Sequence, residues 1–186
     1  MKYIFFVFLA IIIYRLLHFL TTPILKKLGI YKYYTPLFLI VPYMPRRYEI
    51  HLGTSWDFFQ LPQISPKIYI DYLTQGLLEL IEDIENCKIQ PDVMFKGCTY
   101  YLKIQTMERF GFHSRKLRPY EFVIFLLSYI EVIILHSISN KKITIISFKN
   151  LIISTITAQE LQQKKNEILK LVPDHKNGTK DYIMQF

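Results

Sequence analysis

The first 47 residues of the chain contain no acidic residue, and a long apolar run dominates them. The run begins at Tyr3 and reaches Leu20, with Arg15 and His18 as its polar members. About 20 mainly apolar residues can cross a bilayer as a helix, and long polar side chains can reach the headgroups from inside it. Residues 1–22 therefore predict a membrane helix that either spans the bilayer or lies along its interface. A cleaved signal peptide and a buried core helix are the alternatives.

Positive charge is concentrated in the same region. Seven of the 23 basic residues precede residue 48, whereas all 15 acidic residues follow it, so the rest of the chain is close to neutral. Basic residues beside an apolar segment favour anionic lipid headgroups, so we expect membrane lipid as a partner and not nucleic acid. The expected membrane-surface residues are Arg15, Lys26, Lys27, Lys32, Arg46 and Arg47.

The charges also predict an orientation. More basic residues follow the apolar run than precede it, which places the C-terminal domain in the cytoplasm if the helix spans. Two cysteines, Cys87 and Cys98, are expected as free thiols, as is usual in a reducing compartment.

Residues 23–46 are basic, apolar and interrupted by prolines. Because proline is unfavourable inside a helix, we expect an extended or interfacial connector and not a second spanning helix. A hydrophobic loop packed on the domain is the alternative. The tyrosines of the connector would lie at headgroup depth, and they are Tyr31, Tyr33, Tyr34 and Tyr43.

Residues 47–172 carry the patterns of a folded domain, and residues 173–186 read as a polar tail. Alternating and short apolar runs predict strands, the last two forming a hairpin, at 47–52, 93–96, 112–117, 143–148 and 151–156. Helical periodicity and capping signals predict helices at 66–86, 100–109, 120–138 and 158–171. This order predicts an α/β or α+β domain with a mixed sheet of about five strands and four helices.

For two of these helices the sequence must be examined for whether they face the core, lipid or water. Helix 120–138 is apolar nearly all round, with Glu131 in its middle, and such a helix is either buried or in lipid. We expect a core helix. In helix 66–86, Glu79, Glu82, Asp83 and Glu85 are expected to form a solvated face.

Glycine and hydroxyl residues follow the first two predicted strands. They are Gly53, Thr54 and Ser55 after one strand, and Gly97, Thr99 and Tyr100 after the other. If the two strands are parallel neighbours, these residues could line one ligand-binding crevice at their carboxyl ends. Ordinary turns with capping hydroxyl groups are the alternative.

His51 and Asp57 suggest a different chemistry, in which a carboxylate holds a histidine base. The pair resembles that of membrane-linked glycerolipid acyltransferases, which use a His and an Asp separated by four residues and a later Glu-Gly-Thr segment. Here five residues separate the pair, and Lys96 precedes Gly97 where that family has Glu.

A second resemblance lies at Glu108–Phe112. This segment is similar to the helix-then-Gly-Phe ending of acetyltransferases of the GNAT type, but their acetyl-CoA loop is absent.

No metal-ligand spacing and no cofactor motif occurs in the sequence. We therefore expect a membrane-anchored binding or regulatory module that takes a protein partner or an anionic ligand, and neither cofactor nor metal. A membrane-associated acyl- or acetyltransferase-like enzyme is the alternative. A third possibility is an accessory subunit of a membrane complex or a homo-oligomer.

Overall fold

A mixed, six-stranded sheet organises the molecule. The computed structural model describes residues 2–60, 65–100, 102–139, 141–143, 145, 148 and 151–171. The elements are α1 (Lys2–Lys27), β1 (Lys32–Tyr33), β2 (Phe38–Met44), β3 (Arg47–Leu52), α2 (Ser55–Gln60), α3 (Pro66–Glu85), β4 (Met94–Thr99), α4 (Ile104–Arg109), β5 (His113–Lys116), α5 (Pro119–Ser139), β6 (Ile152–Thr157), α6 (Ala158–Gln163) and α7 (Lys165–Leu169).

The strands lie in the order β1-β2-β3-β4-β6-β5. β3 and β4 are parallel, and α2 and α3 form the crossover between them, whereas the other neighbouring pairs are antiparallel. The predicted mixed α/β domain is therefore confirmed, with one strand more than expected.

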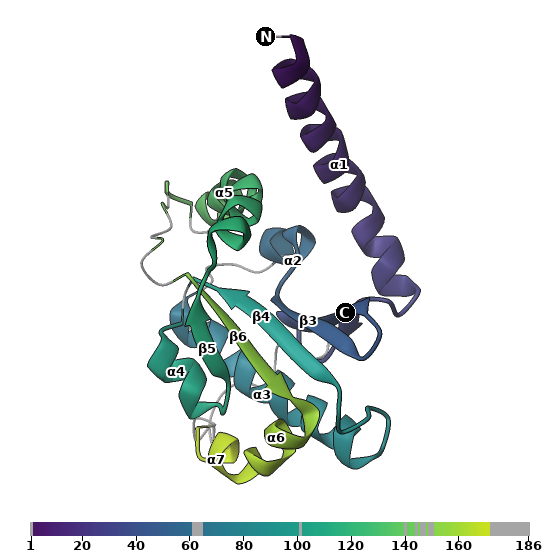
Figure 1. The fold of residues 1–186 in the computed structure, drawn as a ribbon, viewed down its shortest axis with the longest axis vertical. Helices are drawn as coiled ribbons and strands as arrows, with labels where there is room; N and C mark the ends of the chain where they lie inside the picture. Colours follow the sequence, from purple (N-terminus) through teal and green to yellow (C-terminus); the bar gives the residue numbers. More distant parts are fainter. Residues whose placement is uncertain are drawn as a thin grey trace.

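One face of the sheet carries the core. α3 runs behind the strands in Figure 1, and α4, α6 and α7 contribute to the same apolar cluster. Within it, Leu77, Leu80 and Ile81 of α3 are fully buried together with Phe38 and Phe95 of the sheet. α2 and α5 lie beyond one end of the strands, and α1 projects past them (Figure 1).

Local signals start and stop these helices as the sequence predicts. The Ser65 side chain accepts a hydrogen bond from the Ile68 backbone N–H at 3.3 Å, which caps α3. Thr157 and Glu160 form a reciprocal capping box at the start of α6. Gly111 follows α4 with a φ of 87°, a conformation that favours glycine at a helix end.

The prediction of a connector over residues 23–46 is wrong. α1 continues to Lys27, and the following residues form β1 and β2 inside the sheet. Phe38 and Leu39 at the start of β2 are fully buried, because this strand lies between β1 and β3. Pro42 is tolerated in β2 where the register with β3 shifts.

The predicted tyrosine belt is wrong for the same reason. Tyr31 is buried, and the hydroxyl groups of Tyr33 and Tyr34 donate hydrogen bonds to carboxylates of the domain. Tyr43 at the end of β2 is exposed.

The predicted hairpin is also wrong in its pairing. β6 pairs with β4 on one side and β5 on the other. Much of 143–148 lies outside the described residues, and Ile143 and Ile145, which are described, belong to no strand. The single predicted helix over 158–171 is divided into α6 and α7, and the predicted tail lies outside the described residues.

The prediction that helix 120–138 is a core helix is wrong. α5 packs on one side against α2, while Val123, Ile124 and Ile134 are exposed. The structure does not describe the Glu131 side chain. Among the helices that the structure describes, none combines the length and the sustained apolarity needed to cross a bilayer, so a spanning N-terminal helix is not supported.

Candidate functional site

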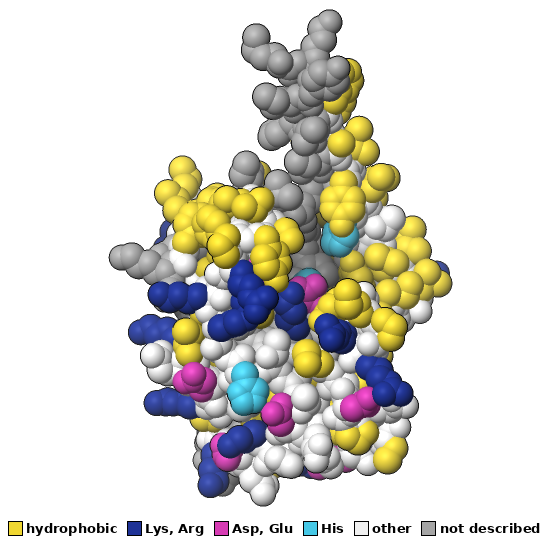
Figure 2. Space-filling model, viewed as in Figure 1, with side chains coloured by type: hydrophobic (Ala, Val, Ile, Leu, Met, Phe, Trp, Pro, Cys, Tyr) yellow, Lys and Arg dark blue, Asp and Glu magenta, His cyan; other side chains and the backbone are white. Residues whose placement is uncertain are grey.

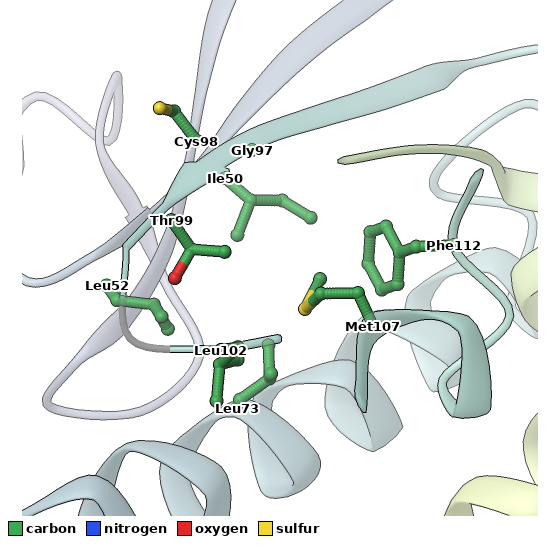
Figure 3. Close-up of a pocket in the computed structure, with 9 residues that line it drawn as sticks. All are labelled: Ile50, Leu52, Leu73, Gly97, Cys98, Thr99, Leu102, Met107 and Phe112. Atoms are coloured by element: carbon green, nitrogen blue, oxygen red, sulfur yellow. The ribbon is translucent and has the colours of Figure 1, made fainter. Parts of the chain in front are cut away.

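The carboxyl ends of β3 and β4 lie side by side, as the crevice hypothesis requires. The cavity at this place has a volume of about 20 Å³, enough for about one water molecule. Apolar side chains converge on it in Figure 3, from Ile50, Leu52, Leu73, Leu102, Met107 and Phe112. Such a space is a packing gap of the core and has no room for a substrate.

The predicted ligand-binding residues do not all lie at this cavity. Gly97 and Thr99 line the cavity, and Thr99 is buried. Gly53, with a φ of 87°, begins the turn into α2, where a Cβ would lie 2.8 Å from Leu37 Cδ2. The Tyr100 ring lies 6.2 Å from the ring of Phe125 in α5.

Thr54, Ser55 and Asp57 lie at the start of α2. The buried Asp57 carboxylate accepts hydrogen bonds from the Thr54 N–H and hydroxyl, both at 2.7 Å, and from the Tyr33 hydroxyl at 2.8 Å. Burial is the main cause that raises the pKa of Tyr33, which therefore stays protonated as a donor. This arrangement resembles a capping box, with Asp in the place of Glu, and it holds β1 against α2.

His51 faces a different carboxylate. Its Nε2 lies 3.6 Å from Glu49 Oε2, two residues earlier on the same strand and therefore on the same face of the sheet. The interaction with His51 is the largest of the causes that lower the pKa of Glu49. The structure therefore joins His51 to Glu49 and Asp57 to Thr54 and Tyr33, and not His51 to Asp57.

Cys98 is among the residues that line the cavity, but its side chain points away from the apolar side chains that fill it (Figure 3). Partial burial of the thiol, reinforced by the charge of Glu49, raises its pKa to about 11. Because only the thiolate is a strong nucleophile, Cys98 is held in its unreactive form near neutral pH. Cys87 and Cys98 are both free, as predicted.

One cluster was missed at the sequence level. Asp83 of α3 was expected on a solvated face, yet its side chain is only 11% exposed and accepts hydrogen bonds from Lys32, Lys88 and Tyr34. Burial alone would raise its pKa, but these three donors outweigh burial and lower the pKa to about 2. Asp83 therefore ties β1 to the end of α3 through structural ion pairs.

The predicted membrane-surface residues have several structural partners. The Lys26 ammonium lies 4.2 Å above the Tyr33 ring, Lys32 contacts Asp83, and Arg46 pairs with Asp92 at 2.6 Å. Lys27 and Arg47 are exposed. The structure does not describe the Arg15 side chain.

The described surface also exposes many large apolar side chains. Exposed large hydrophobic side chains occur along α1, at Phe6, Leu9, Ile12, Ile13, Tyr14, Leu16, Leu17, Leu20 and Ile24. A second set lies on α5 and the residues after it, at Tyr120, Val123, Ile124, Leu126, Ile134, Ile138, Ile143, Ile145 and Phe148. We call α1, α5 and the described residues of 141–148 together the apolar end.

Basic side chains border the apolar end. Figure 2 shows a band of Lys and Arg side chains just below the hydrophobic surface of the α5 region, and apolar side chains along the projecting helix. Soluble monomers rarely expose contiguous apolar patches larger than a few hundred Å², and larger ones mark contact with a partner or a membrane. The apolar end is therefore the best candidate for a functional surface.

Within the described residues, no group of three His, Cys, Asp or Glu side chains is placed to hold a metal ion. Comparisons of the chain with models of protein families, with curated proteins and with solved structures found no match.

Proposed function

We propose that this chain is a membrane-attached binding module whose apolar end enters the lipid and whose sheet domain remains in water. The single observation that carries the proposal is the exposure of large apolar side chains along α1, of which Leu20 is 55% exposed. A helix that is apolar on all its faces is stable only when it is buried in protein or in lipid. α1 needs only to embed in the membrane for this proposal, and no crossing of the bilayer is assumed.

The charge around α1 supports a lipid environment. Lys26 and Lys27 end the helix where it meets the domain, and no acidic residue occurs before Glu49. Basic residues at this position would meet anionic headgroups while the apolar part of the helix lies deeper. Since anionic lipids are abundant on the cytoplasmic leaflet, we place the domain on that side.

The open face of the sheet would serve the binding function. β3 and β4 present Glu49, His51 and Lys96 on the side away from α3. These charges of both signs suit a protein partner or an anionic ligand. Since His51 and Asp57 have separate partners and Cys98 stays protonated, this geometry favours a binding function over a transferase.

Flotation of the full chain with phosphatidylcholine vesicles tests the proposal. We expect the protein to float with the vesicles, and the variant Leu16→Asp/Leu20→Asp to bind at least about tenfold more weakly, because each charge is costly inside lipid. The single variant Leu20→Asp has a matched control in Leu169→Asp, since Leu169 in α7 is similarly exposed (47%) but lies at the opposite end of the molecule.

Two results would overturn the proposal. One is a full chain that stays in the aqueous fraction at every lipid concentration. The other is a stable oligomer in lipid-free buffer that the Leu16→Asp/Leu20→Asp variant breaks into monomers, because a second protein chain would then cover α1.

A further inference from the structure

We propose that α5 and the described residues of 141–148 form a second membrane contact, separate from α1 and selective for anionic lipid. This inference rests on the proposed membrane attachment and names the lipid class that the domain itself recognises. It explains why a helix within the folded domain leaves large apolar side chains uncovered.

Most of the exposed apolar residues described in α5 lie along one side of the helix, and Leu126 lies beside it. Tyr120, Val123 and Ile124 are spaced by three and four residues, and Ile134 and Ile138 repeat that spacing near the other end. Ile124 is 63% exposed. By the same spacing position 131, a glutamate, falls on this side, so the helix would lie in the membrane interface at headgroup depth, where an acid can face water, and not deeper.

The segment after α5 enlarges this side. Ile143 is 86% exposed, an unusual state for an isoleucine in a folded domain. The Phe148 ring returns to α5, where it lies 4.5 Å from the Tyr129 ring and 5.3 Å from the Phe122 ring, measured between centroids. Phe148 therefore brings this segment back to α5, and its exposed isoleucines add apolar surface there.

Positive charges border α5 at both ends, which is the argument for anionic lipid. Lys116 and Arg118 are exposed just before the helix, and Lys141 and Lys142 are exposed just after it. A neutral bilayer or an uncharged protein groove gains nothing from this arrangement, whereas an anionic membrane surface attracts each nearby cation by about 1 kcal/mol.

The acidic residue at the start of α5 does not oppose this attraction. Glu121 is held by Arg115 through two hydrogen bonds of 2.7 Å, and it also accepts the Arg118 backbone N–H. The hydrogen bond from Arg115 is the main cause that lowers the pKa of Glu121 to about 2, so this ion pair persists at neutral pH. The Arg118 side chain itself remains exposed.

α5 and α1 can reach the same membrane. α2 contacts both helices, and the two lie at the same end of the sheet in Figure 1. A domain held at two places would lie in a fixed orientation on the bilayer, and not swing freely at the end of α1.

Binding of the full chain to two kinds of vesicle tests this inference, one of phosphatidylcholine alone and one with a third of phosphatidylglycerol. We expect wild-type protein to bind the anionic vesicles more tightly. Arg118→Gln/Lys141→Gln should reduce affinity for anionic vesicles by about 30-fold at low salt, from about 1 kcal/mol per cation, and leave binding to neutral vesicles nearly unchanged.

The matched control is Lys165→Gln/Lys170→Gln, which removes the same charge from the first residue of α7 and from the residue after this helix, at the far end of the molecule. Far-ultraviolet circular dichroism would establish that both variants fold. Equal losses in the two double variants would overturn the inference, because net charge alone would then explain them.

The outcomes also separate this inference from the proposed function. Equal wild-type affinity for neutral and anionic vesicles overturns the second contact and the role given to Lys26 and Lys27, but leaves apolar attachment through α1 intact. Failure to bind either vesicle overturns both. Ile124→Gln gives an independent reading, since it should weaken binding to anionic vesicles by removing an apolar contact while the net charge of the protein stays the same.

Discussion

The indole N–H of Trp56 donates a hydrogen bond of 2.8 Å to the backbone carbonyl of Phe19, and the two rings stack 4.6 Å apart and 10° from parallel. In an α-helix this carbonyl would accept the N–H of residue 23, but Pro23 has none. Trp56 therefore occupies the acceptor that proline leaves free, and α1 is attached to α2 at this position.

The first prediction concerns the hydrogen bond that Trp56 donates to the Phe19 carbonyl. Trp56→Phe should keep the stacking and lose the hydrogen bond, at a cost of about 1 kcal/mol in the free energy of unfolding. In a Pro23→Ala background the same change should cost much less, because an alanine at this position supplies a backbone N–H to the carbonyl. Urea denaturation of the four proteins measures this coupling. An equal cost of Trp56→Phe in both backgrounds would contradict the assignment.

The second prediction concerns the approach of α3 to β2. A Cβ on Gly76 would lie 2.6 Å from Phe38 Cβ, and both residues are buried. Gly76→Ala should therefore destabilise the fold by about 2 kcal/mol, although alanine favours a helix. Gly97→Ala is the control, since its Cβ would meet Ile50 at an ordinary 3.6 Å. Unchanged thermal stability of Gly76→Ala would refute this packing.

The third prediction follows from Asp83. Its folded pKa of about 2 lies below the usual value of 3.8, so the stabilisation by Lys32 and Lys88 is complete above about pH 4 and is lost as the pH falls toward 2. Asp83→Asn should destabilise the protein by about 1–2 kcal/mol at pH 7 and by much less at pH 2. Chemical denaturation at both pH values provides the measurement. A constant difference between wild type and variant would show that the Asp83 charge contributes nothing.

The sequence predicted correctly those features that depend only on residues close together in the chain. Ser65 with Pro66, Thr157 with Glu160, and Gly111 each satisfy backbone groups within one turn, so these helix ends could be placed correctly without the structure. The parallel pairing of β3 and β4 was a condition of the crevice hypothesis, and the structure meets it.

The failures depend on distant partners. The prolines around β2 suggested a connector, because the sequence does not reveal that Pro42 falls at a register shift opposite β3. Asp83 was expected in solvent because its partners Lys32 and Tyr34 lie about 50 residues away in the sequence.

The pairing of His51 with Asp57 failed for a similar reason. Short sequence spacing suggested it, but His51 projects from a strand face toward Glu49, while Asp57 is occupied at the start of α2. The exposure of α5 was missed because its apolar sequence suits a core equally well.

The fourth prediction tests the central claim, that the apolar end lies in lipid. Trp56 is the single tryptophan of the chain, and α2 lies between α1 and α5. Fluorescence of the full chain with anionic vesicles that contain brominated acyl chains therefore reports directly on the position of the apolar end. We expect a blue shift of the emission and strong quenching by bromine near the headgroups, weakened in Leu16→Asp/Leu20→Asp. An unchanged spectrum and no quenching at saturating lipid would contradict membrane attachment.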